Sequence, residues 1–263
     1  MDSPATLALT RVNHDSSWLI ELDGTRILLD PWLMGPAIVG LPFIHQADLA
    51  EPGLPVDQLP EWHGLVISHP FADHCQVDTL GALPKDRPVF VPAVAWLRTK
   101  RLGRFPSITV LSDGTRGAAP KVLGEVEISY CRASNPFDPT HNGLVFRGRQ
   151  SGRSVVYCPH GLLVGTKTVE RVQERAGGKV DALLCSFSFL DLPFYLGGIA
   201  NLGVEHGKRL VEHLKPTYTF CTHDAPKPDS GFIARIEKLV HPGPLAPLLE
   251  EAGSASRTCG LAV

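Results

Sequence analysis

The stretch His69-Pro-Phe-Ala-Asp73-His74 is the most informative part of the chain, because it places three potential metal ligands within six residues. It follows the apolar run Leu65-Val-Ile-Ser68, which predicts a short buried strand that ends before Pro70. In a loop at the end of a strand, these side chains can turn towards one point. Imidazole nitrogen and carboxylate oxygen both suit zinc and other borderline divalent ions. A turn with solvated polar groups explains the same residues equally well, so the rest of the chain must decide.

The composition is that of an ordinary globular protein. The chain has 263 residues, 43% hydrophobic and 20% charged, which is enough for one large domain, and we expect a single domain over residues 1–263. The net charge is −2 and no Lys/Arg cluster alternates with aromatic residues, so nucleic acid is not an expected partner. Neither a signal peptide nor a run of about 18 apolar residues is visible, so we expect a cytoplasmic protein without membrane contact.

The six cysteines are widely separated, and no two form a Cys-x-x-Cys pair. This spacing favours reduced thiols over a disulfide framework or a cysteine zinc site. We expect most of them to be buried as small apolar residues.

The first third of the chain predicts an antiparallel sheet. Strands are expected at 7–12, 17–22 and 26–30, and Asp23-Gly24 between the last two is a strong hairpin signal. Residues 31–60 are rich in proline and glycine and show little periodicity, so we interpret them as a long loop that forms a flap beside a site. Beyond residue 74 strands and helices mix, with strands predicted at 88–91, 108–111, 122–130, 143–146, 154–157 and 180–185, and helices at 77–83, 94–102 and 168–176.

A helix is predicted over 202–214, where small and apolar residues recur on one face and let it lie close to a sheet. His206 and His213 then fall on its outer face. A last strand follows at 218–222.

Three further histidines stand next to predicted strands. His223 directly follows the strand 218–222, a position like that of His69 after its own strand. His160 ends the strand 154–157 in the same way, although it could instead cap a loop. His141 precedes Asn142-Gly143 and the next strand, and a plain turn explains it equally well.

Together these features resemble the metallo-β-lactamase superfamily, in a branch similar to ascorbate-phosphate lactonases and related plant and bacterial hydrolases. The resemblance covers nearly the whole chain and implies an α/β fold, a four-layer αββα sandwich. The family motif is His-x-His-x-Asp-His, so His69, Asp73 and His74 match it whereas Phe71 replaces the second histidine. By the same resemblance Asp30 supports the site from behind its ligands.

The later ligands also resemble those of the family, with one replacement. His223 matches the late histidine, and His141 is aligned with the third histidine of the motif set. His160 stands where the family usually has an aspartate that bridges two metals, and a neutral imidazole cannot bridge them as a carboxylate does. The resemblance therefore implies a ligand set drawn from His69, Asp73, His74, His141, His160 and His223.

We expect an altered, mononuclear centre at Asp73, His74 and His223. His160 would complete this centre or join His69 and His141 in a weaker second one, which allows one or two ions per chain. Zinc is the expected ion, with manganese or iron allowed.

The implied activity is metal-dependent hydrolysis of a small-molecule substrate. An ion lowers the pKa of its bound water from about 15.7 towards about 7, which supplies hydroxide at neutral pH. Asp73 is expected to be essential, and His69 or His160, where unligated, would act as general base or acid. Lactone, ester or thioester, amide and phosphoester bonds all remain open as substrates.

The segment 187–195 and the flap around Phe43 and His45 are expected to line the pocket, although core packing or a homo-oligomer contact explains the aromatic segment equally well. A degenerate scaffold that binds a ligand or partner without turnover is the alternative function. A redox enzyme is less expected, because no dinucleotide-type glycine fingerprint is present.

Overall fold

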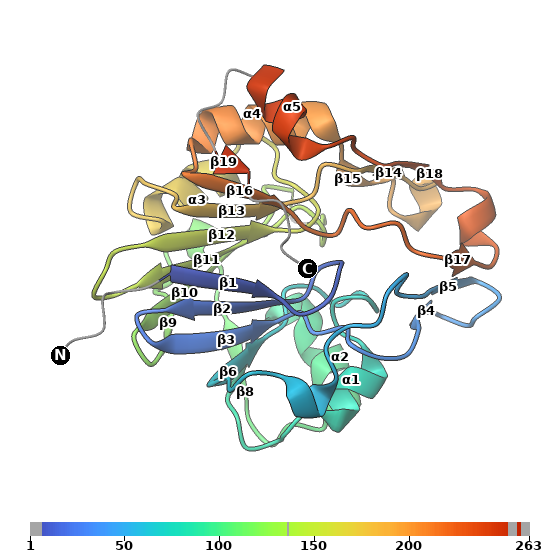
Figure 1. The fold of residues 1–263 in the computed structure, drawn as a ribbon, viewed down its shortest axis with the longest axis horizontal. Coiled ribbons are helices and arrows are strands. Elements are labelled where there is room, and N and C mark those ends of the chain that lie inside the picture. Colours follow the sequence, from blue (N-terminus) through green and yellow to red (C-terminus); the bar gives the residue numbers. More distant parts are fainter. Residues whose placement is uncertain (1–6, 136, 252–256, 259–263) are drawn as a thin grey trace.

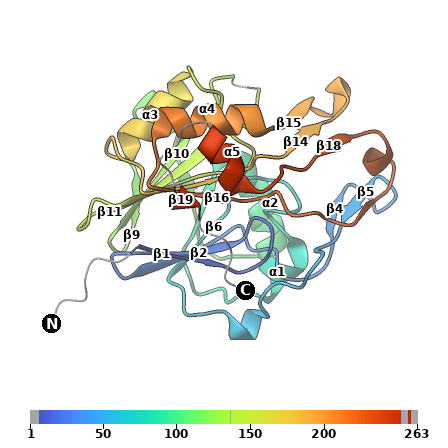
Figure 2. The same ribbon diagram turned by 45° about the horizontal axis from the view of Figure 1, so that its top comes forward.

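Two β-sheets lie face to face in the structure, a computed structural model that describes residues 7–135, 137–251 and 257–258. Helices cover the outer face of each sheet, α1 and α2 on one side and α3, α4 and α5 on the other (Figure 1, Figure 2). Their bounds are α1 (Val77–Ala82), α2 (Ala93–Gly103), α3 (Lys167–Arg175), α4 (Val204–Leu214) and α5 (Leu245–Glu251). The predicted αββα sandwich is therefore confirmed.

The first sheet has six strands, in the spatial order β1-β2-β3-β6-β7-β8. Its opening strands pair antiparallel, as predicted, and β3, β6, β7 and β8 then run parallel. Asp23 and Gly24 both have positive φ in the turn between β2 and β3, as that hairpin requires. The bounds are β1 (Leu7–Arg11), β2 (Trp18–Leu22), β3 (Thr25–Leu29), β6 (Gly64–Val66), β7 (Val89–Pro92) and β8 (Ile108–Leu111).

The second sheet has seven strands, in the order β19-β16-β13-β12-β11-β10-β9. Strands β9 to β12 are antiparallel neighbours, whereas β12, β13, β16 and β19 are parallel. The bounds are β9 (Lys121–Leu123), β10 (Val126–Cys131), β11 (Gly143–Gly148), β12 (Ser154–Cys158), β13 (Ala182–Cys185), β16 (Tyr218–Cys221) and β19 (Arg257–Thr258).

Alternation along the strands builds the core in three layers. In β2 and β3, residues such as Ile20 and Ile27 pack between the two sheets, whereas Leu28 points to the opposite side and packs with α1 and α2. In β12, Val155 and Tyr157 face the first sheet, and Val156 contacts the layer of α3 and α4. Each large sheet is thus buried on both faces, which explains its nearly continuous apolar strands.

Two small sheets stand beside the sandwich (Figure 1). One has the order β15-β14-β18 and the other β17-β5-β4. Their bounds are β4 (Ala37–Val39), β5 (His45–Ala47), β14 (Phe189–Asp191), β15 (Ile199–Leu202), β17 (Asp229–Ser230) and β18 (Lys238–Val240). Short 3₁₀ turns occur at η1 (Val56–Gln58), η2 (Gly114–Arg116), η3 (Phe194–Leu196) and η4 (Ile233–Arg235).

The structure corrects two of the predicted elements. The single strand expected over 122–130 is a hairpin of β9 and β10, because Gly124 adopts φ 53° and reverses the chain. The expected loop 31–60 contains the strands β4 and β5, whose pairing with each other and with β17 is not visible in the local sequence pattern. We call the hairpin 37–47 the flap.

The described cysteines, 75, 131, 158, 185 and 221, are free thiols, and all but Cys221 are buried. Cys259 lies outside the described residues. The assignment of residues 1–263 to one domain stays a prediction. Within the described ranges, no helix has both the length and the apolar character needed to cross a bilayer.

Candidate metal centre

Four histidines from three strand ends meet at one edge of the sandwich. His69 follows β6, His74 precedes α1, His160 follows β12 and His223 follows β16. The ring centroids of His69, His74 and His160 lie 4.7–5.1 Å apart. The His223 ring lies 5.0 Å from His74 and 4.9 Å from His160. Residues from both halves of the sequence therefore form one buried histidine cluster.

The Nδ1 atom of three of these rings faces an oxygen acceptor. His74 pairs with Asp30 at 2.7 Å, His160 with Asn201 at 2.8 Å, and His223 with Asp15 at 3.1 Å. Since carboxylate and amide oxygens accept, Nδ1 of His74 and of His160 donates, and Nε2 of each neutral ring then has a free lone pair. Nδ1 of His223 also lies 3.3 Å from the ammonium of Lys227. The Nε2 atoms of His74 and His160 are buried and have no hydrogen-bond partner among the described residues. Buried and unpartnered, these atoms fit the requirements of metal ligands.

Ligand-type atoms converge in two groups that share His74. Asp73, His74 and His223 form one group and His69, His74 and His160 the other, each with ligand atoms within 4.8 Å of one another. The carboxylate of Asp73 lies 3.4 Å from Nε2 of His223. Burial alone would raise the pKa of Asp73, but His74 and His223 outweigh it and hold this pKa below its ordinary value. The residue types and the spacing of the Asp73 group suit a divalent cation.

His69 is placed differently from the other three rings. Its Nε2 donates to the carbonyl oxygen of Thr140 at 2.9 Å, and its Nδ1 lies 2.7 Å from the hydroxyl of Ser68. The ring of Phe71 stacks on it at 5.7 Å with an interplanar angle of 12°. Burial lowers the pKa of His69 to about 3, so the ring is neutral. A role for His69 as ligand or acid–base catalyst stays a prediction, and it would require one of these hydrogen bonds to break.

His141 belongs to neither group of ligand-type atoms. Its Nδ1 pairs with Asp138 at 2.7 Å, and its Nε2 is buried without a hydrogen-bond partner among the described residues. His206 and His213 lie on α4, half-buried and exposed respectively, outside both groups.

Asp30 lies behind His74 and accepts hydrogen bonds from four donor groups. It is fully buried at the end of β3, with φ 44°. Its carboxylate accepts from the backbone N–H of Ser68 at 2.7 Å, from the Ser68 hydroxyl, from Tyr157 at 2.8 Å and from His74. Burial lowers the pKa of His74, but the charges of Asp73 and Asp30 outweigh it, so the pKa lies above its ordinary value.

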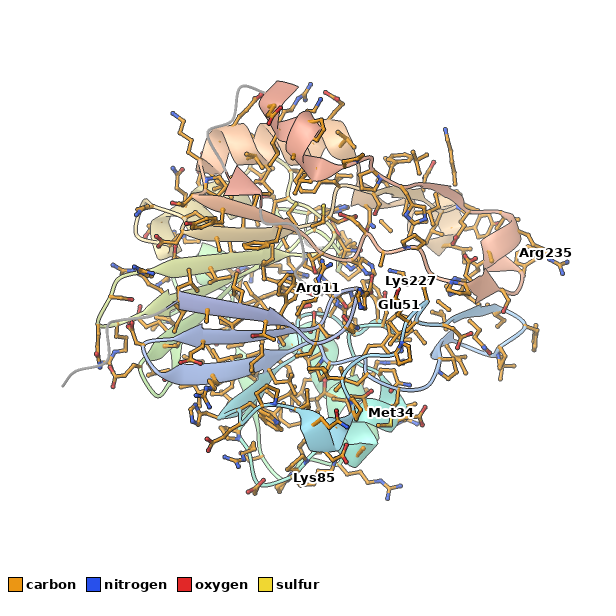
Figure 3. All side chains as sticks on the ribbon, in the orientation of Figure 1. Arg11, Met34, Glu51, Lys85, Lys227 and Arg235 are labelled. Carbon is orange, nitrogen blue, oxygen red and sulfur yellow. The ribbon has the colours of Figure 1, made fainter. Side chains whose placement is uncertain are left out.

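Three residues at the centre were not predicted from the sequence. Asp15 and Lys227 form a buried ion pair at 2.6 Å behind His223, and Asn201 orients His160 from β15. Burial alone would raise the pKa of Asp15, but Lys227 and His223 hold it far below its ordinary value. The polar run 13–17 between two strands looks like an ordinary turn, and only the burial of Asn13, Asp15, Ser16 and Ser17 reveals its role. Figure 3 shows Lys227 where the large sheets meet the small ones.

A cavity of about 120 Å³ opens beside the centre. Asp73, His223 and Lys227 line it, and so do the flap residues Ala37, Val39, His45 and Ala47. Ser188 and Leu190 of the segment 187–195 line it as well, whereas Phe187 packs in the core and Phe194 and Tyr195 are exposed at the surface. Phe43 at the tip of the flap is also exposed, at 71%.

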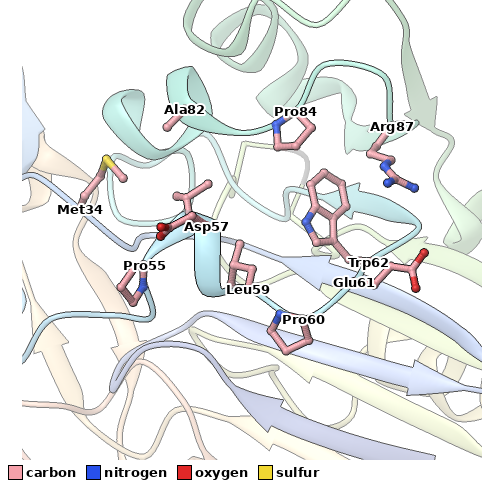
Figure 4. A pocket seen from close by; sticks show the side chains of 11 residues that line it. Met34, Pro55, Asp57, Leu59, Pro60, Glu61, Trp62, Ala82, Pro84 and Arg87 are labelled. Atoms are coloured by element: carbon pink, nitrogen blue, oxygen red, sulfur yellow. The ribbon is translucent and has the colours of Figure 1, made fainter.

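A larger pocket, about 530 Å³, lies on another part of the molecule around Trp62, Met34 and Arg87 (Figure 4). None of the candidate ligands lines it. Of these two, the small cavity is the one lined by candidate ligands, Asp73 and His223.

The comparisons with known proteins agree with this arrangement. The model of the beta-lactamase superfamily domain matches residues 9–223. The chain therefore belongs to the metallo-β-lactamase superfamily. No curated protein sequence matches it at a significant level.

Several solved structures share the fold. An isothiocyanate hydrolase from Delia radicum gut bacteria has a TM-score of 0.66 and 17% identity, covering 95% of this chain and 94% of that one. Igni18, a metallo hydrolase from Ignicoccus hospitalis KIN4/I, has a TM-score of 0.64 and 15% identity, covering 97% and 94%. CmlA, a diiron β-hydroxylase from Streptomyces venezuelae, has a TM-score of 0.61 and 19% identity, covering 84% of this chain and 45% of that one. At these identities the similarity concerns the fold.

Proposed function

We propose that this protein is a metal-dependent hydrolase of a small molecule. The observation that carries the proposal is the orientation of the imidazoles. His74, His160 and His223 each have Nδ1 held by an oxygen acceptor beside Asp73, and the Nε2 atoms of His74 and His160 are buried without a partner. Holding unpartnered lone pairs in a dry site costs stability, so their retention favours a bound ion.

Asp73, His74 and His223 would hold the ion, with His160 as a fourth ligand. This ligand set suits zinc and also allows manganese or iron. The fold of the diiron protein CmlA is compatible with the iron alternative. When bound, such an ion supplies water activation near neutral pH and polarises the bond that is cleaved.

The residues around the ligands have defined tasks. Asp30 and Asn201 accept from Nδ1 of His74 and His160 and so orient these rings. Asp15 holds the ring of His223, and Lys227 compensates the buried charge of Asp15. The cavity wall of Ala37, Val39, Ala47 and Leu190 excludes bulk water from the reacting bond. These groups preorganise the centre, so little reorganisation is needed during the reaction.

The substrate class follows from the cavity and the fold. A cavity of about 120 Å³ fits a small molecule or one end of a larger one. Lactone, ester or thioester, amide and phosphoester bonds are the candidates, and the isothiocyanate hydrolase of the same fold adds isothiocyanates. We also propose a cytoplasmic protein with no nucleic-acid or membrane partner, and a homo-oligomer is compatible with the exposed aromatic residues Phe194 and Tyr195.

The test combines metal analysis with a hydrolysis screen across these bond types. We expect at least about one equivalent of metal per chain and activity that Asp73→Ala abolishes, because the variant loses a ligand. Asp138→Asn serves as a control of similar burial outside the ligand groups and should retain activity. Less than about a tenth of an equivalent of metal after supplementation would instead favour a degenerate scaffold, and an Asp73→Ala variant as active as the wild type would show that the assigned site is wrong.

A further inference from the structure

A third group of ligand-type side chains joins the flap to the segment 229–237. His45, Asp229 and Glu237 each offer one ligand atom, and these three atoms lie within 4.8 Å of one another. Nε2 of His45 is 4.0 Å from a carboxylate oxygen of Glu237. We propose that these three side chains form a second divalent-cation site, separate from the histidine centre.

The charges and the burial of this group distinguish it from a solvated acidic patch. Only 9% of the Glu237 side chain and 19% of the His45 side chain are exposed, although Asp229 is open to solvent. Burial, followed by the neighbouring Asp229, raises the pKa of Glu237 to about 7. Lys227 opposes this shift, but its ammonium donates to Asp15 at 2.6 Å. A side-chain hydrogen bond with Asp229 contributes to this rise, and a divalent ion would replace the proton that the two carboxyl groups share.

Tertiary pairing, not local sequence, brings the three residues together. Asp229 begins β17, which pairs antiparallel with β5, the strand that begins at His45. The N–H groups of Phe232 and Ile233 then donate to the carbonyl oxygens of Phe43 and Ile44, so the chain continues along the flap. Glu237 follows at the end of η4, where its N–H donates to Ile233. Backbone hydrogen bonds thus hold the three segments that carry these side chains next to one another.

The group also lines the cavity of the histidine centre. His45, Asp229 and Glu237 contribute to the same wall as Asp73 and His223. An ion held by them would connect β5, β17 and the segment after η4, which together form one side of the cavity. One imidazole nitrogen and two carboxylate oxygens suit Zn²⁺ or Mn²⁺ and leave positions for water or a substrate group. The ion would therefore stiffen the flap over the cavity.

The test separates this site from the histidine centre by mutation. His74→Ala removes the residue that the two ligand groups of the histidine centre share. Zn²⁺ that this variant still binds is therefore assigned to a site outside that centre. We expect metal-free His74→Ala protein to bind Zn²⁺ in isothermal titration calorimetry, and the added change Glu237→Gln to weaken this binding at least about tenfold. In the wild-type background, Glu237→Gln should lower the zinc content by about one equivalent and leave the tightest site unchanged.

Two further variants test whether the effect is specific to this site. Glu212→Gln removes the same charge from the exposed face of α4 and should change neither content nor affinity. Asp229→Asn should reproduce the effect of Glu237→Gln, with circular dichroism showing that each variant is folded. Zn²⁺ should also slow hydrogen exchange in residues 37–47 of His74→Ala protein, and Glu237→Gln should abolish this slowing.

Absence of Zn²⁺ binding by His74→Ala protein, or equal binding with and without Glu237→Gln, would overturn the proposal. Neither readout uses hydrolysis, so the result is independent of the activity proposed above.

Discussion

At the scale of single residues, the centre depends on the groups behind the ligands. Asp30 accepts hydrogen bonds from His74, Tyr157 and Ser68, and it thereby connects the first sheet with the second. An asparagine at this position would tolerate the positive φ but would present an NH₂ group to some of these donors. The orientation of His74 therefore depends on the charge of the buried Asp30 carboxylate and on the number of hydrogen bonds that it can accept.

We expect Asp30→Asn to weaken Zn²⁺ binding about 10–100-fold, because His74 loses its acceptor. Its free energy of unfolding should fall by about 1–3 kcal/mol, since buried donors are left unsatisfied. Competition with a chromophoric chelator measures the first effect and urea denaturation the second. Asp138→Asn is the control, since its partner His141 lies outside both ligand groups. Equal losses in both variants would place His141 in the centre.

The second prediction concerns the contribution of the Lys227–Asp15 ion pair to stability. Lys227→Met removes the cation that pairs with the fully buried carboxylate of Asp15. We expect the free energy of unfolding to fall by about 3 kcal/mol at neutral pH. This is near the low end for a broken buried pair, because the Lys227 side chain is 20% exposed. Lys179→Met is the matched control, because Lys179 is exposed and pairs with Asp181 at the surface. Its free energy of unfolding should fall by less than about 1 kcal/mol.

The same pair gives stability a defined pH dependence. The pKa of Asp15 is lower in the folded chain than its ordinary value of 3.8, so its contribution is present above about pH 4 and is lost as the pH falls further. The difference in unfolding free energy between wild type and Lys227→Met should therefore shrink below pH 4. Urea denaturation of metal-free protein from pH 3 to 7 measures it, and a constant difference would contradict the assignment.

At the scale of elements, α4 shows how a small residue sets the distance between a helix and its neighbour. Gly207, Leu210, Val211 and Leu214 are its buried residues, as the predicted apolar face requires. A Cβ atom on Gly207 would overlap the ring of Phe187, which packs beneath the helix. The helix can approach this closely only because position 207 has no side chain.

Gly207→Ala is therefore expected to lower the free energy of unfolding by about 1–3 kcal/mol through overpacking. Gly81→Ala in α1 is the matched comparison, because no atom lies within 4 Å of the added methyl group. It should stabilise the protein by about 0.5–1 kcal/mol, the usual gain of alanine over glycine in a helix. Thermal unfolding followed by circular dichroism compares the two, and a neutral Gly207→Ala would show that the helix can shift.

At the scale of the whole molecule, the candidate ligands join the two halves of the sandwich. Asp73 and His74 follow a strand of the first sheet, whereas His160 and His223 follow strands of the second. An ion bound there cross-links both sheets and binds the folded state alone, so it should stabilise the entire fold.

With free Zn²⁺ at about 100 times its dissociation constant, the expected gain is about 2.7 kcal/mol. For a chain of this size that corresponds to an increase in Tm of roughly 5–10 °C. Differential scanning calorimetry of metal-free and loaded protein measures the shift. His74→Ala should lose most of it, and an unchanged Tm in the wild type would argue against a site that spans the two sheets.

The sequence by itself determined much of the fold. Hydrophobic periodicity is a local property, and it located most strands, the helix α4 and the strand ends at which His69, His160 and His223 stand. The hairpin of β9 and β10 and the strands of the flap were not predicted, because a glycine turn and long-range pairing define them.

Only the tertiary structure decided which nitrogen atoms are free and which residues hold them. Asp15 lies far in sequence from His223 and Lys227, and Asn201 lies far from His160. The hydrogen bonds that occupy both nitrogens of His69 come from Ser68 and a distant carbonyl group. The group of His45, Asp229 and Glu237 likewise exists only through the pairing of β5 with β17. Hydrogen bonding and burial at these positions depend on contacts between distant segments, so no local pattern of residues records them.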